Sequence, residues 1–286
     1  MTPDMWQADI GRAGTGRADD DESATRQAGL VAVLDRHDAL AIAVSGGVDS
    51  MVLAYVAHRW SRAAVTAVHA VSPAVPAVAT ARVEAHARRH GWRLQLIDAG
   101  ELADPSYRAN PVDRCYYCKT NLYGRIRAVT GLPIASGTNL DDLGDYRPGL
   151  EAARRHDVVH PFVEAGLAKA DIYALARLHG LDDLAALPAQ PCLASRIETG
   201  IGVEETALAF VEAAEAALAA LMPDEPALRC RITRDGVRIE CGTLPEGAAR
   251  TRLEAWAAAF CEGRGRRFAG LRPYRRGAAF LRSAAE

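Results

Sequence analysis

The chain has 286 residues, 49% of them hydrophobic, so it can bury one large core or two modest ones. Its 34 Lys and Arg residues nearly balance its 36 Asp and Glu residues, which disfavours a general attraction to nucleic acid or an anionic membrane. No apolar stretch reaches transmembrane length and no signal-peptide pattern is present. We therefore expect a cytoplasmic protein whose six cysteines are thiols or metal ligands.

Taken in chain order, residues 1–27 show no sustained apolar period and are predicted to be a flexible leader. From Ala28 onward, strand and helix patterns alternate. The predicted strands are Ala39–Val44, Ala64–Ala70, Trp92–Ile97 and Leu132–Ser136. The predicted helices are Gly29–Asp35, Ser50–Trp60, Ala77–His90, Cys118–Thr130 and Asp171–His179. This alternation predicts an α/β domain over residues 28–200, with a doubly wound parallel sheet.

The pattern changes after about Gly202. The predicted elements there are a helix at Glu204–Leu221, strands at Leu228–Thr233 and Val237–Cys241, a helix at Pro245–Phe260 and a basic tail. Residues 201–286 are therefore predicted to form a separate, smaller α+β domain.

The segment Ser45–Ser50 reads Ser-Gly-Gly-Val-Asp-Ser and joins the first predicted strand to a helix. Such a turn directs backbone N–H groups and the positive end of a helix toward an anion. Asp49 beside a phosphate requires a cation between them, which suggests Mg²⁺ on a polyphosphate. The alternative is an ordinary strand-to-helix turn. Gly137–Asp142 follows another predicted strand, so both segments are expected to border one crevice.

Three cysteines form the second feature. Cys115 and Cys118 make a Cys-x-x-Cys pair, and Cys192 follows 74 residues after Cys118. The pair alone is compatible with a redox couple, half a zinc site or two buried thiols. Three thiolates fit an iron–sulfur cluster better than a four-ligand structural zinc site, and they would leave one iron without a protein ligand. Cys230, Cys241 and Cys261 are interpreted as small core residues.

With these features the chain resembles the LarE-type pyridinium biscarboxylate sulfur transferases, a branch of the PP-loop ATP pyrophosphatases. The segments that carry the resemblance are Ser45–Ser50, Asn110–Lys119, Gly137–Asp142, Asp145–Gly149, Pro191–Arg196 and Arg229–Arg231. The resemblance implies a PP-loop, adenine nucleotide α-hydrolase-like domain and a homo-oligomer. It also implies a small-molecule substrate, pyridinium-3,5-biscarboxylic acid mononucleotide. One carboxylate of this substrate is adenylated by ATP and then receives sulfur, a step toward the nickel-pincer nucleotide of lactate racemase.

The resemblance implies two sulfur sources. Some members sacrifice one active-site cysteine, which becomes dehydroalanine. Others hold a [4Fe-4S] cluster on three cysteines and receive sulfide from a donor. Because Cys115, Cys118 and Cys192 are all present, we favour the cluster type, with Cys192 as the catalytic cysteine.

Roles for the ATP half follow from the loop and the resemblance. The residues expected to hold the ATP pyrophosphate and Mg²⁺ are Ser45, Gly46, Gly47, Asp49 and Ser50. Those expected to border the nucleotide, unless they form a simple strand-end turn, are Gly137, Thr138 and Asn139. Three carboxylates, Asp141, Asp142 and Asp145, would either orient a metal or loop or form an ion-pair network with Arg147. Lys169 matches a family position or caps its segment.

For the sulfur half, Lys119 and Arg114 flank the Cys-x-x-Cys pair and would lower a thiol pKa or bind phosphate, unless they form a solvated surface pair. Arg229 and Arg231 lie two apart on a predicted strand, hence on one face, which suits a phosphate clamp for the substrate. The alternative is surface charge on an edge strand. Ser195 and Arg196, beside Cys192, are the next candidates.

Other functions compete with this one. A tRNA thiolase with a PP-loop and three cluster cysteines would need a basic RNA-binding surface, which the net charge of −2 disfavours. Amide-forming PP-loop synthetases are disfavoured because no glutaminase signature is present. A non-catalytic ATP-binding module would leave the three cysteines without a role.

Overall fold

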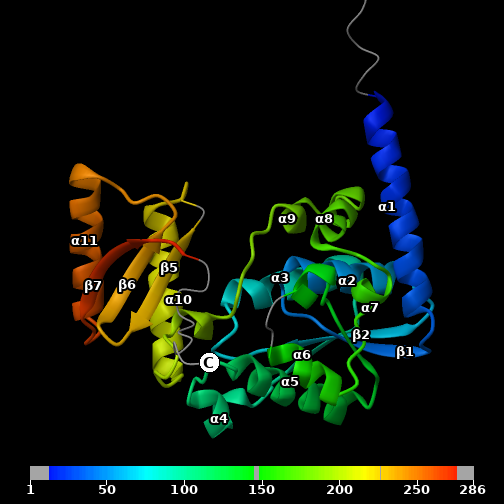
Figure 1. Cartoon of the computed structure of the whole chain (residues 1–286), viewed down its shortest axis with the longest axis horizontal. Coiled ribbons are helices and arrows are strands. Elements are labelled where there is room, and N and C mark those ends of the chain that lie inside the picture. The colour runs from blue at the N-terminus through cyan, green and yellow to red at the C-terminus, as the bar shows by residue number, and fades with distance from the viewer. Residues whose placement is uncertain (1–12, 145–147, 226, 276–286) are drawn as a thin grey trace, which may run out of the picture.

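A computed structural model describes residues 13–144, 148–225 and 227–275 (Figure 1). Its larger lobe contains four parallel strands in the order β3-β2-β1-β4. Their bounds are Ala39–Ala43 for β1, Ala64–Ala70 for β2, Leu94–Ile97 for β3 and Ile134–Ser136 for β4. The predicted α/β class with a parallel sheet is confirmed. Two of the strands, β3 and β4, each begin two residues later than expected.

Helices cover both faces of this sheet, as a doubly wound fold requires. On one face lie α1 (Ala13–Leu34), α2 (Val48–Trp60), α3 (Ala77–His90) and α8 (Lys169–Leu178), and on the other lie α5 (Arg114–Thr130) and α6 (Pro148–Arg155). Alternate residues of strand β1 show the reason. Leu40 and Ile42 pack into the hydrophobic core shared with α1, α2, α3 and α8, whereas Ala41 packs into the core shared with α5 and α6. The shorter helices are η1 (Glu101–Ala103), α4 (Pro105–Arg108), η2 (Leu140–Gly144), α7 (Pro161–Glu164), α9 (Asp182–Ala185) and η3 (Leu193–Arg196).

The predicted leader is wrong for residues 13–27, because α1 begins at Ala13; residues 1–12 lie outside the described residues. Leu30 and Leu34 near the end of α1 are fully buried in the core that α2 and α8 share. Arg26 also forms an ion pair of 3.0 Å with Asp171 of α8. These contacts fix the last turns of α1 and so supply the costly helix nucleus. Each preceding residue can then extend the helix with one backbone hydrogen bond, without an apolar face of its own.

The smaller lobe, with β5 (Leu228–Thr233), β6 (Gly236–Cys241) and β7 (Phe268–Pro273), packs against α10 (Glu205–Leu221) and α11 (Gly247–Glu262) (Figure 1). Strands β5 and β6 were both predicted; they pair antiparallel, and β7 adds parallel to β6. The sequence predicted only a basic tail for β7. The exposed residues of β7 and its Gly270 obscure the alternation typical of a strand. The segment becomes a strand because it pairs with β6.

The three remaining cysteines, Cys230, Cys241 and Cys261, are buried in the small lobe, which confirms their interpretation as core residues. The same core includes Tyr107 and Leu193 from the larger lobe. The proposed boundary between residues 200 and 201 therefore stays a prediction. No helix in the described ranges has the length and apolarity needed to cross a membrane.

Candidate functional site

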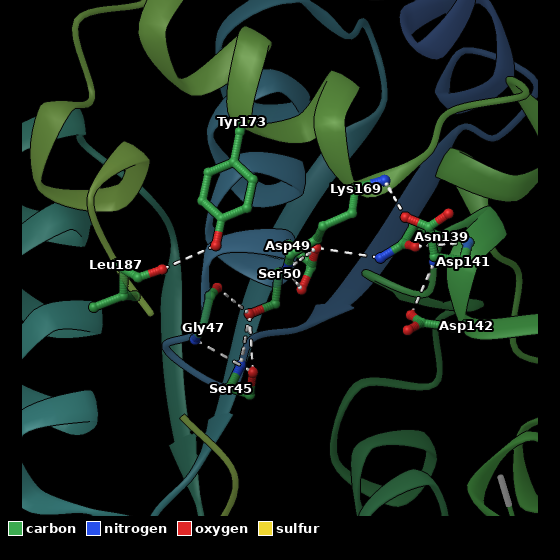
Figure 2. A network of polar contacts seen from close by, with 10 residues as sticks. All are labelled: Ser45, Gly47, Asp49, Ser50, Asn139, Asp141, Asp142, Lys169, Tyr173 and Leu187. Atoms are coloured by element: carbon green, nitrogen blue, oxygen red, sulfur yellow. Dashed lines mark hydrogen bonds and ion pairs between the residues drawn. The ribbon is translucent and has the colours of Figure 1, made fainter. Parts of the chain in front are cut away.

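The segment Ser45–Ser50 leaves β1 and enters α2 through Gly47, the residue that precedes the helix (Figure 2). The Ser50 hydroxyl accepts a hydrogen bond from the Ser45 amide at 3.0 Å and donates one to the Gly47 carbonyl at 3.1 Å. The two serine hydroxyls are 3.1 Å apart, so they also interact directly. The loop therefore holds its own shape at the N-terminal end of α2, where a phosphate is favoured.

Two glycines allow a close backbone approach around this loop. Gly46 has φ +82°, and a Cβ there would lie 2.9 Å from the Ala79 carbonyl oxygen of α3. A Cβ on Gly137, at the end of β4, would lie 2.7 Å from the Ser50 amide nitrogen. Only glycine fits either position without movement of the backbone. The structure thus brings the two segments into contact, and the expectation that both border one crevice stays a prediction.

Asp49 is the centre of a polar network beside the loop (Figure 2). Its carboxylate accepts hydrogen bonds from Lys169 Nζ at 2.6 and 2.7 Å and from Asn139 Nδ2 at 3.3 Å. The Lys169 ammonium also lies 5.3 Å from the Tyr173 ring centre. In this arrangement the carboxylate already pairs with a cation at the position where the sequence predicted a metal ligand.

The carboxylates after Asn139 hold the turn together. Asp142 accepts from the Asn139 amide at 3.2 Å, and Asp141 accepts from the Lys169 amide at 2.9 Å. These contacts fit the loop-orienting role, and the ion-pair network with Arg147 stays a prediction. Asp145 and Arg147 lie outside the described residues. The Thr138 hydroxyl contacts that of Ser136 at 3.0 Å, next to the same turn.

One pocket connects the loop with the cysteines. Val44 and Ser45 line it on one side, and Cys118, Lys119 and Cys192 line it on another. Apolar residues from the ends of β1 and β2 and the start of α3 provide much of the remaining wall. The cavity volume is about 150 Å³, smaller than a typical drug-sized ligand site, and its mouth is open to solvent.

Helix α5 begins at Arg114 rather than at Cys118, so Cys115 and Cys118 share its first turn and, three residues apart, one helix face. Burial first, and then the nearby Cys192, together raise the pKa of the Cys118 thiol to about 12. Lys119 opposes this effect, and its own pKa is raised first by the interaction with Tyr123. Arg114 is buried and donates to Asn110 Oδ1, so the solvated-surface interpretation is wrong for this arginine.

The donor set fits an iron–sulfur cluster chemically. Cys118 interacts electrostatically with both Cys115 and Cys192, which places the three thiols in one neighbourhood. Within the part of the chain that the structure describes, no three His, Cys, Asp or Glu side chains are placed to hold one metal ion. A cluster makes a different demand, because each thiolate binds its own iron rather than a shared centre.

The predicted substrate arginines make internal contacts. Arg196 forms a two-point pair with Glu215 at 2.9 and 3.0 Å and donates to the Cys192 carbonyl at 3.0 Å. Arg231 is 6% exposed and pairs with Glu240 at 2.9 Å, so the surface-charge alternative is wrong for it. Arg229 lies 5.6 Å from the Tyr274 ring centre. The phosphate clamp stays a prediction.

Ser195 is buried, and its carbonyl accepts from Arg231 at 2.8 Å. Sequence reasoning missed three residues at this site. Arg82 of α3 donates to the Gly46 carbonyl at 2.7 Å and to the Gln190 side chain at 3.1 Å. Glu101 and Tyr107 line the pocket. None of the three belongs to a spaced motif, so the single sequence carried no signal for them.

The parallel sheet, the glycine turn at the end of β1 and the adjoining pocket define an α/β protein of the PP-loop type. No protein-family profile matches the chain. A pyridinium-3,5-bisthiocarboxylic acid mononucleotide synthase of Lactiplantibacillus plantarum is 32% identical over 228 residues, which cover 78% of this chain and 80% of that protein. An uncharacterized protein of Synechocystis is 35% identical over 207 residues, covering 71% of this chain and 76% of its own length. The chain therefore belongs to the LarE-type family of pyridinium-3,5-bisthiocarboxylic acid mononucleotide synthases.

Proposed function

We propose that the chain is an ATP-dependent sulfur transferase of nickel-pincer nucleotide biosynthesis. It adenylates one carboxylate of pyridinium-3,5-biscarboxylic acid mononucleotide and converts that group to a thiocarboxylate. The observation that carries the proposal is that Ser45 and Cys192 line the same pocket. The name of the Lactiplantibacillus relative supports the choice of substrate.

In the first half of the reaction, a substrate carboxylate oxygen attacks the α-phosphorus of ATP. The bond to the pyrophosphate breaks, and a mixed anhydride with AMP remains. The amides of the loop and the hydroxyls of Ser45 and Ser50 stabilise the departing pyrophosphate by positioned positive charge. Asp49 would hold Mg²⁺, and Lys169, freed from Asp49, would neutralise phosphate charge.

In the second half, a sulfur nucleophile attacks the activated carbonyl carbon and AMP leaves with the bonding electron pair. Cys115, Cys118 and Cys192 would hold a [4Fe-4S] cluster, which would supply the sulfur for transfer after receiving it as sulfide from a donor. Lys119 lines the same pocket, and its ammonium would attract an anionic sulfur or phosphate group. We further propose that the chain acts as a homo-oligomer.

Anaerobic purification with iron and sulfide analysis, followed by a single turnover with ATP and the biscarboxylate nucleotide, tests this proposal. We expect about four irons and four sulfides per chain, and one pyrophosphate released for each thiocarboxylate formed. An active, iron-free protein whose Cys192 becomes dehydroalanine would overturn the cluster assignment. Sulfur transfer to tRNA, with none to the biscarboxylate nucleotide, would overturn the substrate assignment.

A further inference from the structure

Two buried polar side chains in the pocket have no assigned role. Glu101 is 4% exposed at the start of η1, and its Oε2 has no hydrogen-bond partner among the described residues. Tyr107 of α4 is 1% exposed, and its hydroxyl likewise has no partner within those ranges. Both residues line the pocket together with Cys118 and Cys192. We call Glu101 and Tyr107 the polar corner.

The polar corner is costly for the protein by itself. A buried polar group that loses water without gaining a hydrogen bond destabilises the folded state, and a carboxylate does so more than a hydroxyl. Native structures rarely keep such groups except where a ligand or a functional demand explains them. The two unpaired groups therefore indicate that a ligand completes the polar corner.

The rest of the pocket wall narrows the class of ligand. Ser45 belongs to the anion-binding loop, and an apolar wall that includes Ala70, Val75 and Pro76 suits a flat ring. A carboxylate repels phosphate but accepts hydrogen bonds from hydroxyl groups, whereas a phenol hydroxyl both donates and accepts. The matching group is a pair of neighbouring hydroxyls, as on a ribose, which acidic side chains also bind in other nucleotide sites.

We propose that Glu101 and Tyr107 bind the ribose hydroxyls of the nucleotide in this pocket. This inference rests on the proposed function, in which both ATP and the pyridinium mononucleotide carry such a ribose. Because both ligands carry ribose hydroxyls, the experiment must distinguish which of the two nucleotides binds the polar corner.

Equilibrium binding provides the test. Dissociation constants are measured for a non-hydrolysable ATP analogue and for the pyridinium mononucleotide, each in its ribose and 2′- and 3′-deoxyribose forms. We expect the native chain to bind the ribose form of one of them about tenfold more tightly. In Glu101→Met this preference should disappear, and in Tyr107→Phe it should shrink. The nucleotide for which Glu101→Met no longer distinguishes ribose from deoxyribose is the one that binds at the polar corner.

A thermal melt of the ligand-free protein gives a second readout. Glu101→Met should raise the melting temperature, because it removes a buried carboxylate whose Oε2 has no partner among the described residues. A carboxylate with a structural role would lower it on substitution. Glu205→Met is the matched control, because Glu205 is exposed and does not line this pocket. This control should leave the ribose preference unchanged.

Equal binding of ribose and deoxyribose forms by the native chain would overturn the inference, as would an undiminished preference in Glu101→Met or a lowered melting temperature. Failure of the proposed function would give a different result: the native chain would release no pyrophosphate with the biscarboxylate nucleotide. Glu101→Gln, which keeps one acceptor oxygen and the side-chain volume, should show an intermediate ribose preference.

Discussion

The two ends of the pocket satisfy their polar groups in different ways. At the loop end, Ser45 and Ser50 bond to each other and to the backbone, and Asp49 is paired with Lys169. At the thiol end, the Tyr107 hydroxyl and one Glu101 oxygen have no partner among the described residues. The loop end is thus shaped before a ligand arrives, whereas the thiol end needs the ligand to complete it.

The largest expected effect separates the chemistry of the two ends. Cys192→Ala should reduce thiocarboxylate formation by about 10³-fold or more, because the sulfur-bearing group is lost. Pyrophosphate release at the loop end should continue. Both products are measured in single turnovers, with Cys261→Ala, which changes a buried cysteine of the small lobe, as the control. Parallel loss of both products would show that the two ends do not act separately.

Gly137→Ala should disturb the loop end, because the new Cβ would meet the Ser50 amide nitrogen at 2.7 Å. A displacement of this kind is expected to slow pyrophosphate release by about 10²-fold. Gly124→Ala is the matched control, since its Cβ would have its nearest neighbour at 3.7 Å. If Gly137→Ala keeps its rate of pyrophosphate release, the loop end is less rigid than its contacts indicate.

Arg82 physically joins the two ends, because it contacts Gly46 of the loop and Gln190 near Cys192. Arg82→Gln should raise the KM for ATP by about fivefold, the effect of one lost hydrogen bond, and should release pyrophosphate without matching thiocarboxylate. Arg88→Gln on the same helix changes an exposed side chain and serves as the control. If Arg82→Gln still forms one thiocarboxylate for each pyrophosphate released, Arg82 does not couple the reactions at the two ends.

The smallest effect concerns pH and the helices behind the loop end. Burial lowers the pKa of His58 on α2, His90 on α3 and His179 after α8 below the ordinary value of 6.5. The unfolded chain therefore binds more protons, and stability should fall as pH decreases below about 6.5. Melting temperatures between pH 8 and pH 5 measure this slope. His179→Phe should flatten it, and an unchanged slope would assign the acid sensitivity to other groups.

Local motifs made much of the fold and site predictable. The strand, glycine turn and helix around Ser45–Ser50 occupy one contiguous stretch, and alternating patterns revealed the parallel sheet. The N-terminal half of α1 escaped prediction because it extends a helix whose last turns are held by contacts with other helices, and β7 escaped because pairing with β6 stabilises it. Arg196 and Arg231 were recognised as important residues, but their carboxylate partners, Glu215 and Glu240, are not evident from sequence spacing.

The sequence by itself determined the α/β class, the strand, glycine turn and helix around Ser45–Ser50, and the Cys115 and Cys118 pair, because each depends on short-range spacing. Cys192 was added to the pair by its residue chemistry and by the family resemblance, not by spacing. Only the tertiary structure decided that Ser45 and Cys192 line one pocket, and that Glu101 Oε2 and the Tyr107 hydroxyl there have no partner among the described residues. The physical reason is that burial and hydrogen-bond pairing are properties of neighbours in space. Glu101 and Cys192 line one pocket although they are distant along the chain, so no local sequence pattern records that they share it.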